Sequence, residues 1–286
     1  MFLSVNSTSI LFEKREALSL IQSFSGKKDT ASFPNITRED FYYYLRKRVN
    51  KPQSIYQQDA SLCGPAAFIY ILATQKPLAY VKYAIDLYER GVASIGNIVV
   101  KPSRACRSYT YSSAINVCDW VTLASLRDSE NLFFNYDSHS DAISGITLPS
   151  KISEWFKKSG YTTVENNTNL IFDKSASNLA NASRKFLSGH NVCLFVGSDI
   201  FIGTKKGRAP ADHWVVLTSP ILVDNKPISS FFTNGSRRED ESAMWDKKIS
   251  FTVYTWGNDH WPVNRNISDL KMGDFMDFYY GFVSAK

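Results

Sequence analysis

Apolar and polar residues follow two different patterns along the chain, and the pattern changes in its last third. Up to about residue 190, apolar residues recur three or four positions apart, which is typical of helices with one buried face. This spacing predicts helices at Phe12–Phe24, Arg38–Val49, Leu78–Arg90, Ser113–Arg127, Lys151–Ser159 and Ala176–Ser188.

Boundary residues support several of these helices. Thr37 precedes the second helix as its predicted N-cap, with Asp40 at the third helical position. Gly91 and Gly189 each follow the last residues of a periodic stretch, where a glycine commonly ends a helix. Another run begins Cys63-Gly64-Pro65 and is closed by Pro77, and it has no polar face over two turns. Because a proline is tolerated in the first turn of a helix, this run predicts a buried helix with Cys63 at its N-terminus.

The last third of the chain is rich in β-branched and aromatic residues, which favour strands. The predicted strands are Asn191–Gly197, His213–Thr218, Ile249–Gly257 and Asp277–Val283, with a polar loop at about Asp224–Lys247. Helices followed by a mostly antiparallel sheet indicate an α+β fold. We expect residues 1–50 to form a helical N-terminal extension and residues 51–286 to form the main domain.

Composition and charge indicate an ordinary globular protein rather than a nucleic-acid-binding one. The chain has 286 residues with 44% apolar and 21% charged residues, which is ordinary for a globular protein. The formal net charge is +6, and the short basic clusters are Arg46–Lys51, Lys205–Arg208 and Arg237–Arg238. No recognisable nucleic-acid-binding module accompanies them, so we expect no nucleic-acid partner.

The cysteines and histidines argue against a zinc site or a disulfide scaffold, and the N-terminus argues against a secretory signal. Four cysteines without a C-x-x-C pair, and four histidines without an H-E-x-x-H pattern, indicate neither a zinc site nor a disulfide scaffold. We therefore expect no metal and no cofactor. The N-terminus lacks the pattern of a secretory signal, and no run of about eighteen apolar residues predicts a membrane span. We expect a cytoplasmic protein, unless it is exported without a cleaved signal.

Cys63 is the best candidate for a nucleophile. A cysteine reacts as its thiolate, and both the positive end of a helix and a nearby imidazolium favour that form. Cys63 lies at the positive end of a predicted helix, and His213, the first residue of a predicted strand, could supply the imidazolium. An acyl-transfer site also needs donors for the oxyanion. Gln57, six residues before Cys63, is the candidate side chain, with Gln58 as its rival and the Cys63 N–H as the second donor.

Two segments resemble papain-like cysteine peptidases. The stretch QQDASLCGPA from Gln57 to Ala66 is similar to their nucleophile segment, most of all in bacteriocin-processing domains that cleave after Gly-Gly. His213-Trp214-Val215-Val216-Leu217 resembles the histidine strand of the family. The resemblance covers about fifteen residues and implies a papain-like fold for residues 51–286. It also implies a Cys63–His213 thiolate-imidazolium pair and hydrolysis of peptide bonds.

The third member of the site departs from the family pattern. Papain-like enzymes orient the histidine with an Asn or Asp, and Trp256-Gly257 resembles the Trp-Gly that follows the family's Asn. The Asn position itself holds Tyr254. We take Thr255 as the candidate that orients His213, and Tyr254, Asn258, Asp259 and a plain dyad stay open.

The middle segment DWVTLASLRDSEN, from Asp119 to Asn131, has no counterpart in the core family and suggests a divergent branch, and it looks similar to papain-like domains found in bacterial antagonistic toxins. This likeness implies an effector that cleaves a protein inside a target cell, with a cognate immunity protein as a second partner. The same Cys-His pair also serves glutamine deamidases, transglutaminases and acyltransferases. The absent Asn or Asp leaves a third alternative, a papain-like binding module without catalysis.

Overall fold

A computed structural model describes residues 5–26, 31–58, 60–109, 115–131, 146–169, 175–204, 210–232 and 243–286. Two of the three basic clusters, Lys205–Arg208 and Arg237–Arg238, lie outside this part of the chain. The chain divides into two compact units. The first unit comprises residues 1–145 and 158–160, and the second comprises residues 146–157 and 161–286. Helices from the predicted extension and from the predicted main domain share the first unit, while the proposed boundary after residue 50 stays a prediction.

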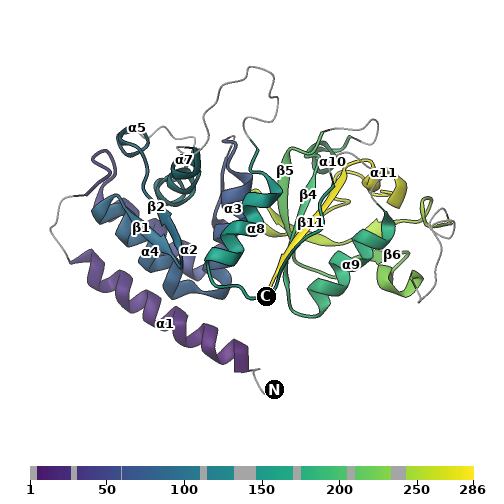
Figure 1. Ribbon diagram of the computed structural model, residues 1–286, viewed down its shortest axis with the longest axis horizontal. Coiled ribbons are helices and arrows are strands. Elements are labelled where there is room, and N and C mark those ends of the chain that lie inside the picture. The colour runs from purple at the N-terminus through teal and green to yellow at the C-terminus, as the bar shows by residue number, and fades with distance from the viewer. Residues whose placement is uncertain are drawn as a thin grey trace. The chain divides into compact units, whose positions relative to one another are not determined.

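The first unit begins with two helices that pack through one face each. In α1 (Val5–Ser25) the residues Ala17, Ile21 and Phe24 are buried at helical spacing. Helix α2 (Arg38–Asn50) begins where predicted, because Thr37 accepts a hydrogen bond from the Asp40 N–H at 3.1 Å. Helix α1 packs on α2 and α4, as the left part of Figure 1 shows.

The next two helices form the centre of the first unit. Helix α3 (Cys63–Gln75) is buried from Cys63 to Ala73, as its lack of a polar face predicted. Helix α4 (Pro77–Arg90) starts on a proline and ends at Gly91, whose φ of +66° favours glycine. Both boundaries confirm the prediction to within one residue.

The rest of the first unit is made of short elements: η1 (Pro52–Ser54), β1 (Ala93–Ile95), β2 (Ile98–Val100), α5 (Arg104–Arg107), α6 (Val117–Asp119), η2 (Trp120–Ala124) and α7 (Ser125–Asn131). Strands β1 and β2 form an antiparallel hairpin. The predicted helix Ser113–Arg127 is observed from Val117, where Asn116 caps the Cys118 N–H, and its middle is a π-helix, η2. Its predicted first residues lie partly outside the described chain.

The second unit is built on a six-stranded antiparallel sheet in the order β10-β9-β5-β4-β11-β3. Its strands are β3 (Val164–Asn166), β4 (Asn191–Val196), β5 (His213–Leu217), β9 (Thr252–Thr255), β10 (Asn258–Pro262) and β11 (Tyr279–Ala285). Helix α9 (Ala176–Leu187) packs on β4 and β11 (Figure 1). The described part of this unit also contains the α-helices α8 (Pro149–Lys158), α10 (Asp199–Ile202) and α11 (Met272–Met276). The α+β class is thereby confirmed.

A second, three-stranded sheet changes two predictions. The predicted strand Ile249–Gly257 is divided, because β8 (Ile249–Ser250) pairs with β6 (Leu222–Val223), whereas β9 joins the large sheet. The predicted loop Asp224–Lys247 contains a hairpin from β6 to β7 (Lys226–Pro227) and the short helix η3 (Ile228–Phe231). Asp224 and Asn225 have positive φ, which a two-residue hairpin turn requires.

Candidate active site

Cys63 is the first residue of α3 and lies in the first unit. Only 5% of its surface is exposed. Leu62 precedes it and offers no side-chain cap, while the Leu62 carbonyl accepts the Ala66 N–H at 2.8 Å. Cys63 is thus the first residue of a 13-residue helix, in the first turn, where the partial positive charge of a helix is located. This location confirms the predicted start of the helix at the candidate nucleophile.

The segment that carries Gln57 enters this helix through a tight turn. The Gln57 carbonyl accepts the Ala60 N–H at 3.3 Å, and the Ala60 carbonyl accepts the Leu62 N–H at 2.7 Å. Gln58 has a left-handed backbone with φ of +54°, which non-glycine residues seldom adopt. The residue that directly follows Gln57 therefore has a strained backbone.

His213 begins β5 in the second unit, where it lies opposite Val196 on β4. Only 4% of its surface is exposed. Its Nε2 atom is 2.7 Å from the Thr255 hydroxyl, at the end of β9. The Trp256 ring stacks on the imidazole at 5.2 Å between centroids and 27° between planes. The imidazole therefore has a fixed orientation, with Nε2 committed to Thr255.

Burial also sets the charge of this histidine. Removal from water penalises the imidazolium form, and this lowers the pKa of His213 from 6.5 to about 4. The ring is therefore neutral at pH 7. A neutral imidazole has one nitrogen that accepts a proton, which is the form that a general base needs.

The other residues proposed to orient His213 have different contacts. Tyr254 lies opposite Val216 in the register of β9 and β5. Asn258 accepts the His260 N–H through its side-chain oxygen at 2.8 Å. The Asp259 carboxylate lies 3.7 Å from the exposed His260 ring, and its carbonyl accepts the Thr218 hydroxyl. The hydrogen bond to His213 itself is made by Thr255.

The four predicted site residues divide between the two units. The structure brings His213 and Thr255 together within the second unit. Cys63 and Gln57 belong to the first, six residues apart at the entry to α3. The pairing of Cys63 with His213 stays a prediction.

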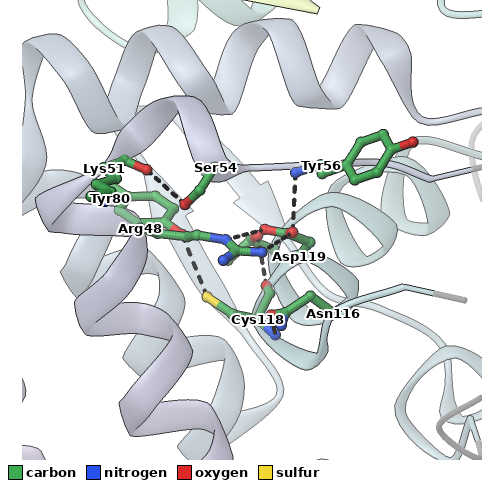
Figure 2. Close-up of polar contacts among 9 residues, drawn as sticks. Arg48, Lys51, Ser54, Tyr56, Tyr80, Asn116, Cys118 and Asp119 are labelled. Carbon is green, nitrogen blue, oxygen red and sulfur yellow. Dashed lines mark hydrogen bonds and ion pairs between the residues drawn. The ribbon is translucent and has the colours of Figure 1, made fainter. Parts of the chain in front are cut away.

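A buried ion pair in the first unit was missed from the sequence (Figure 2). Arg48 on α2 donates from Nε to Asp119 Oδ1 at 3.0 Å, and its terminal nitrogen donates to Oδ2. Asp119 Oδ2 also accepts the Tyr56 N–H at 3.1 Å. Arg48 is 3% exposed and Asp119 is fully buried. The periodic pattern held a signal, since Arg48 lies seven residues after Phe41 and three after Leu45, on the apolar face of α2.

Each charge of this pair stabilises the ionised form of the other residue. Burial lowers the pKa of Arg48, but the hydrogen bonds and the charge of Asp119 outweigh that effect, and the net pKa is raised. Burial raises the pKa of Asp119, against the opposing effect of the Arg48 guanidinium and the Tyr56 N–H. Because an arginine does not lose its proton in proteins, we take the pair as ionised.

The other three cysteines lack the features of a nucleophile. Cys106, Cys118 and Cys193 are buried free thiols. Burial raises the pKa of Cys106 and of Cys118 to about 12, and it raises that of Cys193 further. A thiol with so high a pKa is almost fully protonated at pH 7 and reacts slowly.

Within the part of the chain that the structure describes, no group of three or more His, Cys, Asp or Glu side chains could hold a metal ion. Among the same residues, no helix combines the length and apolar character that crossing a membrane requires.

Fold and side chains together define an α+β protein with a buried His-Thr pair on an antiparallel sheet and a cysteine at the start of a buried helix. No family model, no curated protein and no solved structure matches this chain. The function of this protein is therefore inferred from its own residues.

Proposed function

We propose that this protein is a cysteine peptidase of the papain-like type, with Cys63 as nucleophile and His213 as general base. The observation that supports this most is the buried hydrogen bond of 2.7 Å between His213 Nε2 and Thr255. It holds a neutral imidazole in one orientation, as a triad's third member does. The place of Cys63 at the start of α3 is the second support.

The His213 pKa refines the chemistry expected from the sequence. With a pKa of about 4, the ring is neutral while Cys63 is a thiol, and a neutral ring is the form that acts as a general base. His213 Nδ1 takes the thiol proton as the Cys63 sulfur attacks the peptide carbonyl. The proton then passes to the leaving amine, and the acyl group stays on sulfur. Water, deprotonated by the same ring, releases the acid and regenerates the thiol.

The developing oxyanion needs donors that are in place before the reaction. The first proposed donor is the Cys63 backbone N–H, which belongs to the first turn of α3. The Gln57 side-chain amide is the second donor. Removal of one such donor costs about 100- to 1,000-fold in kcat.

The first test uses a fluorogenic peptide amide that ends in Gly-Gly, the specificity that the family resemblance implies. We expect Cys63→Ala and His213→Ala to lose turnover by about four orders of magnitude or more with the fold unchanged. Cys106→Ala, which removes a buried thiol of high pKa, is the matched control and should keep activity. Proteolysis at the wild-type rate in Cys63→Ala would refute the assignment.

A second test concerns proximity and does not depend on a substrate. The short bifunctional reagent 1,3-dibromoacetone should alkylate Cys63 and then join it to His213. Peptide mapping should find this cross-link in the wild type and a single Cys63 adduct in His213→Ala. A Cys63 adduct without a cross-link in the wild type would contradict the pairing.

Mass spectrometry of treated proteins separates the chemistries that share this pair. Fragments indicate proteolysis, exchange of an amide for an acid indicates a deamidase, and an adduct indicates a transferase. An unreactive Cys63 would indicate a binding module. From the family resemblance we also propose that this protein is an effector that acts inside a target cell, with a cognate immunity protein as a second partner.

A further inference from the structure

We propose that the buried Arg48–Asp119 ion pair is a positioning device for the oxyanion donor Gln57. This inference rests on the proposed function, because it assigns a role in the same site. Neither Arg48 nor Asp119 is proposed to touch the substrate. They act through the backbone of Tyr56, the residue before Gln57.

The contacts of the Asp119 carboxylate carry this inference. Three N–H groups converge on its two oxygens, two from Arg48 and one from the Tyr56 backbone (Figure 2). Arg48 fixes the carboxylate from α2, and the carboxylate in turn fixes the chain where it leaves η1. Tyr56 is thereby held by a charged acceptor, which makes a stronger hydrogen bond than a neutral one.

The chain from this anchor to the nucleophile is short and defined at both ends. It leaves the buried Ile55, is held at Tyr56, turns through the left-handed Gln58 and enters α3 at Cys63. Gln57 lies between the Tyr56 N–H held by Asp119 and the left-handed Gln58, and its own carbonyl accepts the Ala60 N–H at 3.3 Å, so its backbone is restrained on both sides. An oxyanion donor depends on such preorganisation, because it must lie in place before charge develops.

A purely structural role explains the pair less well. Taking two charges out of water is costly, and apolar residues of similar volume often replace a buried ion pair without loss of stability. What such residues cannot replace is an acceptor for the Tyr56 N–H. The inference also gives α2 a role in the site, although its residues belong to the predicted N-terminal extension.

Two double variants separate the charge from the acceptor. Arg48→Met with Asp119→Leu replaces the pair by apolar side chains and removes the acceptor. Arg48→Gln with Asp119→Asn removes both charges but keeps a side-chain oxygen for the Tyr56 N–H. The matched control is Tyr83→Phe, which deletes another buried hydrogen bond of the first unit, that to the Thr122 carbonyl at 2.7 Å.

The first readout is hydrogen exchange of the peptide that spans residues 55–62, which needs no substrate. We expect exchange about tenfold faster in the apolar pair, and close to the wild-type rate in the polar pair and in Tyr83→Phe. Wild-type exchange in the apolar pair would overturn the positioning role, whatever the activity of the protein.

The second readout is turnover of the Gly-Gly peptide amide. We expect kcat of the apolar pair to fall about 10- to 100-fold with KM nearly unchanged, and the polar pair to restore it. Added to Gln57→Ala, the apolar pair should cause little further loss, since both remove the same donor. Alkylation of Cys63 by iodoacetamide develops no oxyanion and should keep its rate.

The outcomes separate this inference from the proposed function. If exchange increases but kcat is unchanged, Asp119 positions the segment without serving the reaction, and the inference fails. If the wild type turns over no substrate and Cys63 resists alkylation, the proposed function fails, and the inference fails with it. Equal loss of kcat in the polar and apolar pairs would also contradict it, because the acceptor would then not matter.

Discussion

The low pKa of His213 makes the stability of the protein depend on pH in a definite direction. In the folded state this pKa is about 4, and in the unfolded chain it returns to about 6.5. Between these values the unfolded chain binds a proton that the folded chain does not. Stability is therefore fully present above pH 6.5, falls as the pH drops toward 4, and does not change further below that value.

The size of the effect follows from the difference in pKa. A shift from 6.5 to about 4 corresponds to about 3 kcal/mol of unfolding free energy, lost between neutral pH and pH 4. His213 is 4% exposed, so little screening by water reduces this value. The loss is a large fraction of the stability of an ordinary domain, about 5–15 kcal/mol.

Urea unfolding at a series of pH values measures this effect. His213→Gln is the comparison, since glutamine is of similar size, can keep a hydrogen bond to Thr255 and does not titrate. Both proteins should carry Cys63→Ala, which removes any effect of a thiolate on the imidazole. Other titrating groups are shared, so they cancel in the difference between the two curves.

The expected result is that the two proteins converge or cross as the pH falls, with the difference in unfolding free energy changing by about 3 kcal/mol between pH 7 and pH 4. An NMR titration of the His213 ring should give a midpoint near 4. Parallel stability curves, or a ring that titrates near 6.5, would refute the reasoning that burial keeps this imidazole neutral.

Three further substitutions test local features. Thr255→Val should lower kcat about 10- to 100-fold with the peptide amide, because His213 loses its orienting hydrogen bond; an unchanged kcat would exclude that role. Gly281→Ala should cost about 2 kcal/mol more in urea unfolding than Gly160→Ala. Both glycines have positive φ, but only at Gly281 would a new Cβ clash with a backbone oxygen, that of Asn167, so equal costs would contradict the clash. Thr37→Ala should cost about 1 kcal/mol in the same assay, and no loss would exclude its capping role.

Local pattern predicted the elements well where a boundary residue reinforced the periodicity. Thr37 as a cap, Pro77 as the residue that closes α3 and Gly91 as the stop of α4 marked boundaries that the structure confirms closely. The buried start of α3 at Cys63 was predicted for the same reason, because a proline in the first turn and an uninterrupted apolar run act within a few residues of each other.

Prediction was weaker where the partner of a segment decided its structure. A single β-rich run, Ile249–Gly257, supplies β8 to one sheet and β9 to another. The polar stretch after Asp224 includes a hairpin and a short helix around the buried Ile228. Strand pairing joins residues far apart in sequence, so the pattern of one segment does not reveal which sheet it enters.

The sequence by itself determined the class of fold, the helical start at Cys63 and the β-rich setting of His213, because these depend on spacing and side-chain type over a few neighbouring positions. Only the tertiary structure decided that Thr255 bonds His213, that burial keeps this imidazole neutral, and that Arg48 and Asp119 meet beside Tyr56. Those features depend on desolvation and on contacts between residues more than forty positions apart, neither of which a linear pattern contains.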